Sequence, residues 1–285
     1  FGVFNALSGA AEIAFALGTP PDLLETTANG VGGSTTLTYQ PSSQFTNTNL
    51  HFAIPVVTKT ATSDGMGHTY TTTYTYSGGR YDPATQEFRG FATATVADAI
   101  GTTTTTTFSQ DLHTKGRPLS AEVRDHAGRL FTKTTSTWSC TEPYPGVHFA
   151  RLEQTESAVY DGDASFKQTR SRFRYDDYGN LTEALEDGQV DPPLTGDERT
   201  TLTTFAYNPT DWILNRPSLT QTRDAAGTLL AQRRFYYDEA TATTTPPTVG
   251  RLTKEEAWRN LPAEQWLATT LTYDPLGNVK TVTDA

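Results

Sequence analysis

The chain has 285 residues, a net charge of −10 and a pI of about 4.9. An acidic field of this size repels phosphate backbones and anionic lipid head groups, so we expect neither nucleic acid nor membrane-surface partners. Hydrophobic residues make up 35% of the chain, and about one residue in five is threonine. Threonine suits a half-buried pleated surface, and the composition therefore favours an extended β-sheet over a thick apolar core.

The cysteine content and the hydropathy of the chain further limit the class of protein. Cys140 is the only cysteine, so we expect neither a disulfide framework nor a cysteine-based metal site. The longest apolar run, in Ala10–Leu17, contains Glu12 and is too short to cross a bilayer, so we expect no membrane insertion by this segment. The chain starts at Phe1 and stops at Ala285, where a further turn would open, and we expect it to be part of a longer protein.

In chain order, residues 1–19 are expected to form an irregular lead-in, in which Ala6–Leu17 has the composition of a short helix interrupted by Gly9. From residue 20 to 285 we expect one continuous all-β structure, because strand-forming residues flank every turn and no linker of disordered composition occurs. The six threonines of Thr102–Thr107 leave a turn and end on a phenylalanine, which indicates a strand, although a glycosylated or low-complexity linker has the same composition.

One short unit organises this β-structure. Tyr175–Thr182, with the sequence Tyr-Asp-Asp-Tyr-Gly-Asn-Leu-Thr, returns near the end of the chain as Tyr273–Val279. Its physical minimum is an Asp that accepts hydrogen bonds from backbone N–H groups and, three residues later, a Gly in the left-handed conformation that reverses the chain. Turns of this kind are predicted at Asn29/Gly32, Asp64/Gly67, Asp98/Gly101, Asp125/Gly128, Asp176/Gly179, Asp224/Gly227 and Asp274/Gly277.

The last part of the chain is the most regular, because its Asp-x-x-Gly units recur about every 50 residues. Between them we expect half-period hairpins with longer tips at Asp187–Asp197 and Asp238–Gly250, which gives about one hairpin per 25 residues and is typical of a repeat architecture. The segment Lys254–Leu267 has a helix-like composition, but the repeat predicts a pair of strands there.

Two stretches carry a family resemblance. Gly79–Phe91 resembles the Tyr-Asp-Pro…Arg-Glu-Phe-Arg-Gly-Phe signature of Tc toxin B-type and related Rhs-repeat proteins, with Gln86 in place of the more usual Arg. The repeated unit resembles the YD repeats of Rhs proteins, teneurins and the B and C components of bacterial insecticidal Tc toxin complexes. Pro21–Leu24 and Asn29–Gly33 are similar to the start of that region. The signature positions here are Tyr81, Asp82, Pro83, Glu87, Phe88, Arg89, Gly90 and Phe91.

The resemblance implies serial antiparallel hairpins that form part of a large spiralling sheet or hollow shell, which encloses a toxic C-terminal effector polypeptide. It implies a secreted or cell-surface toxin whose partners are the rest of the shell, the effector and other toxin-complex subunits. The alternative is an extracellular adhesion or glycan-binding β-module like the teneurin shell, and a β-rich glycosidase is a third hypothesis. Because a partial shell has unpaired sheet edges, we expect this fragment to behave poorly alone.

Candidate chemical sites have simpler interpretations. Paired carboxylates catalyse glycoside hydrolysis, but capping a turn accounts for every turn Asp. The Asp274–Gly277 sequence Asp-Pro-x-Gly resembles the C-terminal self-cleavage motif of Rhs shells, yet it lies inside a complete repeat. Asp161, Asp163 and Ser165 have the spacing of a calcium loop, but Arg172 stands where its bidentate Glu belongs, which favours a surface turn.

We therefore expect no enzymatic activity, catalytic residue, cofactor or metal. Cys140 has no evident partner in the sequence and is interpreted as a small filler residue. Arg89, flanked by aromatic residues, is expected to stack on a ring and to bridge to a carboxylate such as Glu87 or a turn Asp, fixing one strand on another. The four tryptophans suit cross-strand aromatic pairs better than a sugar platform, and the histidines show no metal-ligand spacing: Trp138, Trp212, Trp258, Trp266, His51, His68, His113, His126 and His148.

Overall fold

The computed structural model describes residues 2–4, 11–13, 22–47, 49–162, 164–260 and 263–285. Within these residues the regular secondary structure is β-strand, apart from one 3₁₀ turn, η1 (Ser42–Gln44). No helix in this part of the chain is long and apolar enough to cross a membrane. Residues 11–13 form strand β2 (Ala11–Ile13), which pairs with β1 (Gly2–Phe4), so a helix does not cover them. The rest of the candidate helix Ala6–Leu17 lies outside the described residues.

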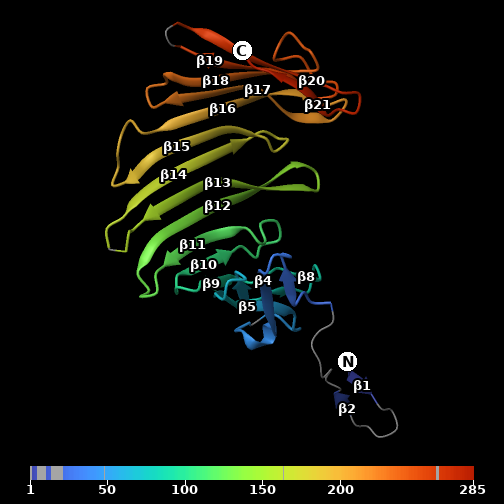
Figure 1. Ribbon diagram of the computed structural model, residues 1–285, viewed down its shortest axis with the longest axis vertical. Coiled ribbons are helices and arrows are strands. Elements are labelled where there is room, and N and C mark those ends of the chain that lie inside the picture. Colours follow the sequence, from blue (N-terminus) through green and yellow to red (C-terminus); the bar gives the residue numbers. More distant parts are fainter. Residues whose placement is uncertain (1, 5–10, 14–21, 48, 163, 261–262) are drawn as a thin grey trace.

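Nearly all other strands belong to one antiparallel sheet, in which each strand pairs with its neighbours in the chain (Figure 1). Its first strands are β3 (Thr26–Ala28), β4 (Ser34–Pro41), β5 (Pro55–Ser63), β6 (Thr69–Ser77), β9 (Thr93–Ala97) and β10 (Thr103–Phe108). The sheet continues with β11 (Pro118–Arg124), β12 (Leu130–Tyr144), β13 (Val147–Val159), β14 (Lys167–Tyr175), β15 (Leu181–Asp191), β16 (Arg199–Asn208), β17 (Ile213–Asp224), β18 (Leu229–Tyr237), β19 (Leu252–Arg259), β20 (Gln265–Tyr273) and β21 (Val279–Thr283). The predicted fold class, all-β serial hairpins in a shell-like sheet, is confirmed.

The sheet is open at both ends. Among the described residues, β3 pairs only with β4 and β21 pairs only with β20. Figure 1 shows these two edges far apart along the long axis of the molecule, with a steady twist between them. Both edges therefore present unpaired backbone groups, which favours pairing with a further strand.

The sheet buries few apolar side chains. The buried apolar side chains among the described residues are Ala158, Ala206, Leu214, Tyr236, Tyr237 and Pro247. The accessible surface is 18232 Å² for 31.1 kDa, whereas a compact protein of this mass exposes about 12,000 Å². Much of the side-chain contact is instead a series of hydroxyl pairs across neighbouring strands, as between Thr95 and Thr105 at 3.0 Å and between Thr201 and Thr222 at 3.1 Å. The molecule is a wall with two large faces.

Two ambiguous segments are strands, as predicted. Five of the six consecutive threonines lie in β10, where Thr103–Thr107 pair with β9 on one side and with β11 on the other. Within the segment Lys254–Leu267, β19 and β20 pair, and Trp258 lies opposite Trp266. In both places strand pairing outweighs the composition of the isolated segment.

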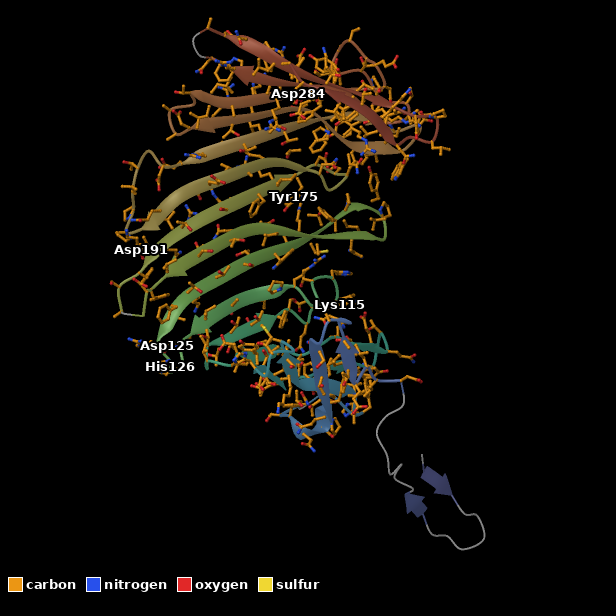
Figure 2. All side chains as sticks on the ribbon, in the orientation of Figure 1. Lys115, Asp125, His126, Tyr175, Asp191 and Asp284 are labelled. Carbon is orange, nitrogen blue, oxygen red and sulfur yellow. The ribbon has the colours of Figure 1, made fainter. Side chains whose placement is uncertain are left out.

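The number of strands between turns differs from the prediction. Asp125 and Asp176 are separated by β12, β13 and β14, Asp176 and Asp224 by β15, β16 and β17, and Asp224 and Asp274 by β18, β19 and β20. Three strands occupy each interval, whereas two hairpins per interval would need four. Because three is odd, successive Asp-x-x-Gly turns lie alternately on the two sides of the wall where the strands end, as the labels of Asp125 and Tyr175 in Figure 2 show.

Two long connections pack on the sheet near its N-terminal end. Residues 42–54 join β4 to β5, and residues 78–92 join β6 to β9 and contain the small hairpin β7 (Tyr81–Asp82) and β8 (Glu87–Phe88). We call these two connections the signature lobe. Inside it, Phe91 lies 5.0 Å from Tyr76 and 5.6 Å from Phe88, measured between ring centroids. Aromatic side chains therefore gather into a cluster in the lobe.

Candidate functional site

The Asp-x-x-Gly turns share one hydrogen-bond pattern. Between β14 and β15, the N–H groups of Tyr178 and Asn180 donate to Oδ1 of Asp176 at 3.0 and 2.8 Å, and Gly179 has a φ of +88°. Equivalent contacts reach Asp64, Asp98, Asp125, Asp224 and Asp274, and Asn29 accepts them through its amide oxygen. The corresponding glycines also have positive φ: Gly32, Gly67, Gly101, Gly128, Gly227 and Gly277.

The Asp176 turn also makes hydrogen bonds to strands outside its own hairpin. Oδ2 of Asp176 accepts hydrogen bonds from the Tyr207 hydroxyl at 2.6 Å and from Asn180 Nδ2 at 2.8 Å, and the same nitrogen donates to the carbonyl of Leu214 at 2.8 Å. Burial would raise the pKa of Asp176, but the hydrogen bonds from Tyr207 and Asn180 outweigh it and lower that pKa. Burial, followed by the hydrogen bond to Asp176, raises the pKa of Tyr207 far above its ordinary value. Tyr207 therefore acts as a permanent donor that ties the turn to β16.

The Asp274 turn has the same local geometry as the others. The N–H groups of Leu276 and Asn278 donate to Oδ1 of Asp274, and Asn278 Nδ2 donates to Oδ2 at 3.0 Å. These hydrogen bonds lower the pKa of Asp274, the Asn278 side-chain bond contributing most. A carboxylate held ionised by its own turn is suited to capping and poorly suited to protonating a leaving group.

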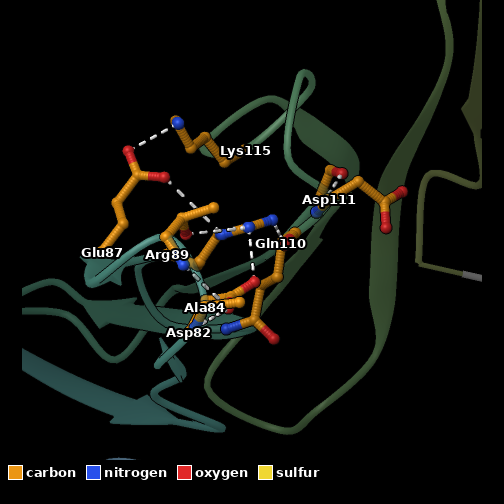
Figure 3. Close-up of polar contacts among 9 residues, drawn as sticks. Asp82, Ala84, Glu87, Arg89, Gln110, Asp111 and Lys115 are labelled. Carbon is orange, nitrogen blue, oxygen red and sulfur yellow. Dashed lines mark hydrogen bonds and ion pairs between the residues drawn. The ribbon is translucent and has the colours of Figure 1, made fainter.

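The signature residues converge on the buried side chain of Arg89, which is 6% exposed (Figure 3). Its Nη2 donates to Oδ2 of Asp82 at 2.5 Å, and its Nε lies 3.6 Å from Oε2 of Glu87. The Arg89 side chain therefore bridges to carboxylates on both strands of the β7–β8 hairpin. The N–H of Ala84 makes the largest contribution to lowering the pKa of Asp82, against the effect of burial, and the positive charge of Arg89 adds to it.

The remaining signature residues surround Arg89 and its two carboxylate partners. Tyr81 packs edge-on against Phe52, with ring centroids 5.3 Å apart, and Phe88 contacts Phe91. Pro83 lies in the turn between β7 and β8. Gly90 has a φ of +83°, and its carbonyl accepts from the Arg80 N–H at 3.1 Å and from the Gln110 side chain at 2.8 Å. The cation–π contacts among the described residues involve other cations, so Arg89 acts through its carboxylates.

The loop of residues 109–117, between β10 and β11, is tied to the signature lobe. Lys115 Nζ lies 2.5 Å from Oε1 of Glu87. Gln110 Nε2 donates to the carbonyl of Gly78 at 2.7 Å, and the carbonyl of Gln110 accepts from Arg89 Nη1 at 3.4 Å. The signature therefore anchors the lobe to the connection between β10 and β11.

The calcium hypothesis has no supporting geometry among the described residues. Asp161 lies in the turn after β13 with a φ of +52°, and Asp163 lies outside the described residues. Arg172 is in β14 and donates two hydrogen bonds to Asp187, from Nε at 2.7 Å and Nη2 at 2.5 Å. A cation occupies the position that a bidentate carboxylate would need.

The longer tip at Asp238–Gly250 contains a carboxylate that the sequence interpretation overlooked. Oδ2 of Asp238 accepts from the N–H groups of Thr248, Val249 and Gly250 at 2.8, 2.9 and 2.9 Å, and Oδ1 accepts from the Arg251 N–H at 2.9 Å. Burial would raise the pKa of Asp238, but these donors lower it. The missed signal is the Tyr-Asp pair of Tyr237–Asp238, which lacks a Gly three residues later.

Three other side chains that the sequence interpretation treated as unrelated come together in the structure. The ligand atoms of His113, Cys140 and His148 all lie within 4.8 Å of one another. The interpretation of His113 and His148 as scattered, and of Cys140 as a filler without a partner, is therefore corrected. A groove of about 700 Å³ lies beside His148, lined by the ends of β12, β13 and β17 and by the β14–β15 and β16–β17 connections, including Tyr144, Tyr178 and Trp212.

Comparisons with known proteins show which family and which solved structures this chain is similar to. The family described as "Insecticide toxin TcdB middle/N-terminal region" matches residues 3–120. The crystal structure of TcdB2-TccC3 has a TM-score of 0.72 and 14% identity over 92% of this chain, and that of TcdB2-TccC3-Cdc42 has a TM-score of 0.70 and 15% identity over 92%. Residues 3–120 therefore resemble the TcdB middle/N-terminal region, and most of the chain shares the fold of the TcdB2-TccC3 structures.

The TcdB-like fold extends beyond the family match. A Photorhabdus luminescens Tc holotoxin pore has a TM-score of 0.68 and 16% identity over 83% of the chain. The chain spans about a fifth of the length of these structures, between 18% and 22%. No curated protein sequence matches it. At these identities the structures establish the fold of the TcdB-like segment, and the family match covers the signature residues.

Proposed function

We propose that this TcdB-like segment forms part of the wall of a hollow toxin shell that encloses an effector polypeptide. The observation that carries the proposal is the continuous open sheet, with two extensive faces and little apolar core, whose terminal strands β3 and β21 each pair on one side only among the described residues. Such a sheet is stable as a repeat structure through contacts between neighbouring strands and can be extended at either edge. The likeness to TcdB2-TccC3 over most of the chain supports the same role here.

In this proposal the work of the segment is steric and not catalytic. Every Asp-x-x-Gly carboxylate is engaged by the N–H groups of its own turn, and Asp82 and Glu87 contact Arg89. The turn residues reverse the chain along the two sides of the wall where the strands end, and the signature residues fix the lobe on the wall. We further propose that residues 20–285 act as one shell unit after a lead-in at 1–19. The partners would be the rest of the shell, the effector and other subunits of a secreted or cell-surface toxin complex.

The test uses the full-length parent chain, co-produced with its C-type partner so that the effector is enclosed. Trypsin should leave the effector intact in the native assembly and degrade it in assemblies that carry Asp176→Ala together with Gly179→Val. The matched control is Asp177→Asn, because Asp177 is the exposed neighbour in the same turn. An effector that is equally sensitive in all three assemblies contradicts the shell proposal. Binding of the segment to a glycan array, without effector protection, favours the adhesion alternative.

A further inference from the structure

The side chains of His113, Cys140 and His148, which belong to three separate segments, form a cluster on one side of the wall, where strands end. His113 is in the loop of residues 109–117, Cys140 is in β12 and His148 is in β13. All three side chains are exposed, and their ligand atoms lie within 4.8 Å of one another. The imidazole rings of His113 and His148 are stacked, with centroids 3.7 Å apart and an angle of 28° between the planes. Nothing in the proposed shell role requires this arrangement.

We propose that these three residues bind a Zn²⁺ ion, or a similar borderline divalent transition metal, through two imidazole nitrogens and one thiolate. Imidazole and thiolate are the ligands that zinc prefers in proteins, and sites with three protein ligands leave a fourth position for water. Bond lengths of about 2.0–2.3 Å in a tetrahedral site place the ligand atoms roughly 3.3–3.7 Å apart. The ligand atoms must therefore approach by about 1 Å or so, and the stacked rings must tilt so that both planes include the metal. Exposed side chains permit this adjustment.

The segments that carry the ligands are held in place by contacts that do not involve the ligands. In the 109–117 loop, Oγ of Ser109 lies 2.6 Å from Oγ1 of Thr114, and the Ser109 N–H donates to the Arg117 carbonyl at 2.9 Å. Trp138 Nε1 in β12 donates to the carbonyl of Pro118 at 2.8 Å, and the Arg117 guanidinium lies 5.1 Å from the centre of the Trp138 ring. The loop is thereby fixed against β12, which reduces the entropy lost when a metal binds.

A metal at this place would brace a part of the wall that has no backbone pairing with β11. β12 pairs with β11 only through Leu130–Thr135, whereas its pairing with β13 continues to Tyr144. The end of the β12–β13 hairpin therefore extends beyond β11, and Cys140 and His148 lie on this extension. Binding of His113 to the same metal would join the extension to the loop before β11. The groove lined by Tyr144 and His148 begins on the same hairpin.

The test uses the untagged full chain, stripped of metal and kept reduced with a non-chelating reductant. Co²⁺, the spectroscopic probe, should produce a thiolate-to-metal absorption band and the intense visible bands of four-coordinate cobalt at one ion per chain, and Zn²⁺ should displace it. His113→Ala, Cys140→Ser and His148→Ala should each lower the affinity for Zn²⁺ at least about tenfold, and Cys140→Ser should abolish the thiolate band. His126→Ala, which removes an exposed histidine from a distant turn, should change neither. Absence of the thiolate band, or equal Zn²⁺ affinity in the cluster variants and in His126→Ala, overturns the proposal.

A thermal measurement provides a second readout that does not depend on cobalt. Zn²⁺ should raise the Tm of the wild-type chain, because a ligand that binds only the folded state stabilises it. Cys140→Ser should retain the metal-free Tm and show no rise with Zn²⁺, since Cys140 is exposed and makes only a long contact of 3.9 Å to the Thr141 carbonyl. An equal rise in the wild type and in Cys140→Ser contradicts the site.

Discussion

The signature lobe and the strands from β10 to β21, which we call the ladder, are stabilised in different ways although they belong to one wall. The lobe brings residues distant in sequence around a buried arginine and a cluster of aromatic rings. The ladder relies on local turns, hydroxyl pairs and ion pairs across neighbouring strands. The lobe therefore behaves like a small globular core, whereas the ladder behaves like a repeat whose stability is the sum of similar local contributions.

The largest expected effect is the loss of the buried arginine. Arg89→Ala should lower the free energy of unfolding of the lobe by about 2–3 kcal/mol, because it leaves Asp82 and Glu87 without their shared cation. All four tryptophans lie in the ladder, so the change should be followed by amide hydrogen exchange in residues 78–92. Arg174→Ala, which breaks an exposed pair with Glu183 in the ladder, should cost no more than about 0.5 kcal/mol. Unchanged exchange in Arg89→Ala would remove the contrast between the two regions.

The second effect separates one turn of the ladder from the others. Asp176→Asn should cost about 1–2 kcal/mol, because the charged acceptor of the Tyr207 hydroxyl is lost. Asp224→Asn should be close to neutral, since Asn29 already satisfies the same pair of N–H donors with an amide oxygen. Urea unfolding followed by tryptophan fluorescence measures both. Loss of a catalytic activity in Asp176→Asn, with stability retained, would contradict the structural role of this turn.

The third effect distinguishes backbone strain from side-chain contact. Gly128→Ala should cost about 1 kcal/mol, because φ is +79° there and an added Cβ has no atom within 4 Å. Gly179→Ala should cost more, since its Cβ would lie 3.2 Å from the ring of Phe149 at a φ of +88°. Urea unfolding of the two single variants and of Gly179→Ala combined with Phe149→Leu makes the comparison. Equal costs for both glycines would show that packing against Phe149 contributes nothing.

The smallest effect is a pH dependence in the ladder. Hydrogen bonds from Arg172 and then from Arg170 hold the pKa of Asp187 below its ordinary value. Since the folded-state pKa is the lower one, this stabilisation is fully present above the unfolded-state pKa of about 3.9 and is lost as the pH falls through the folded-state pKa. Asp187→Asn should therefore be less stable than the wild type at pH 6, and the difference should shrink below about pH 4. A constant difference from pH 6 to pH 2 would exclude this contribution.

The sequence predicts the features that depend on neighbouring residues and misses those that depend on strand pairing. An Asp and a Gly three residues apart contain all the chemistry of their turn, so the position of each Asp-x-x-Gly reversal follows directly. The number of strands between turns does not, because the reversals between β16 and β17 and between β19 and β20 contain no Asp-x-x-Gly unit. The Asp238 cap is also missed, because its donors lie ten or more residues away.

The same limit explains the candidate metal cluster. His113, Cys140 and His148 have no recognisable ligand spacing, and they meet because the β12–β13 hairpin extends beyond β11 towards the preceding loop. That extension is set by register, which turn chemistry alone does not specify. The bridge from Arg89 to Glu87 was predicted because both residues lie in one short motif, and Asp82 joins them through the pairing of β7 with β8.

The most direct test of the wall proposal is photo-crosslinking from both faces of β16 in the full-length assembly with its effector enclosed. Successive residues of a strand point to opposite faces, so crosslinkers at positions 201 and 203 sample one face and those at 202 and 204 sample the other. The wall proposal predicts crosslinks to the effector from one of these pairs and none from the other. Crosslinks from both pairs, or from neither, would contradict it.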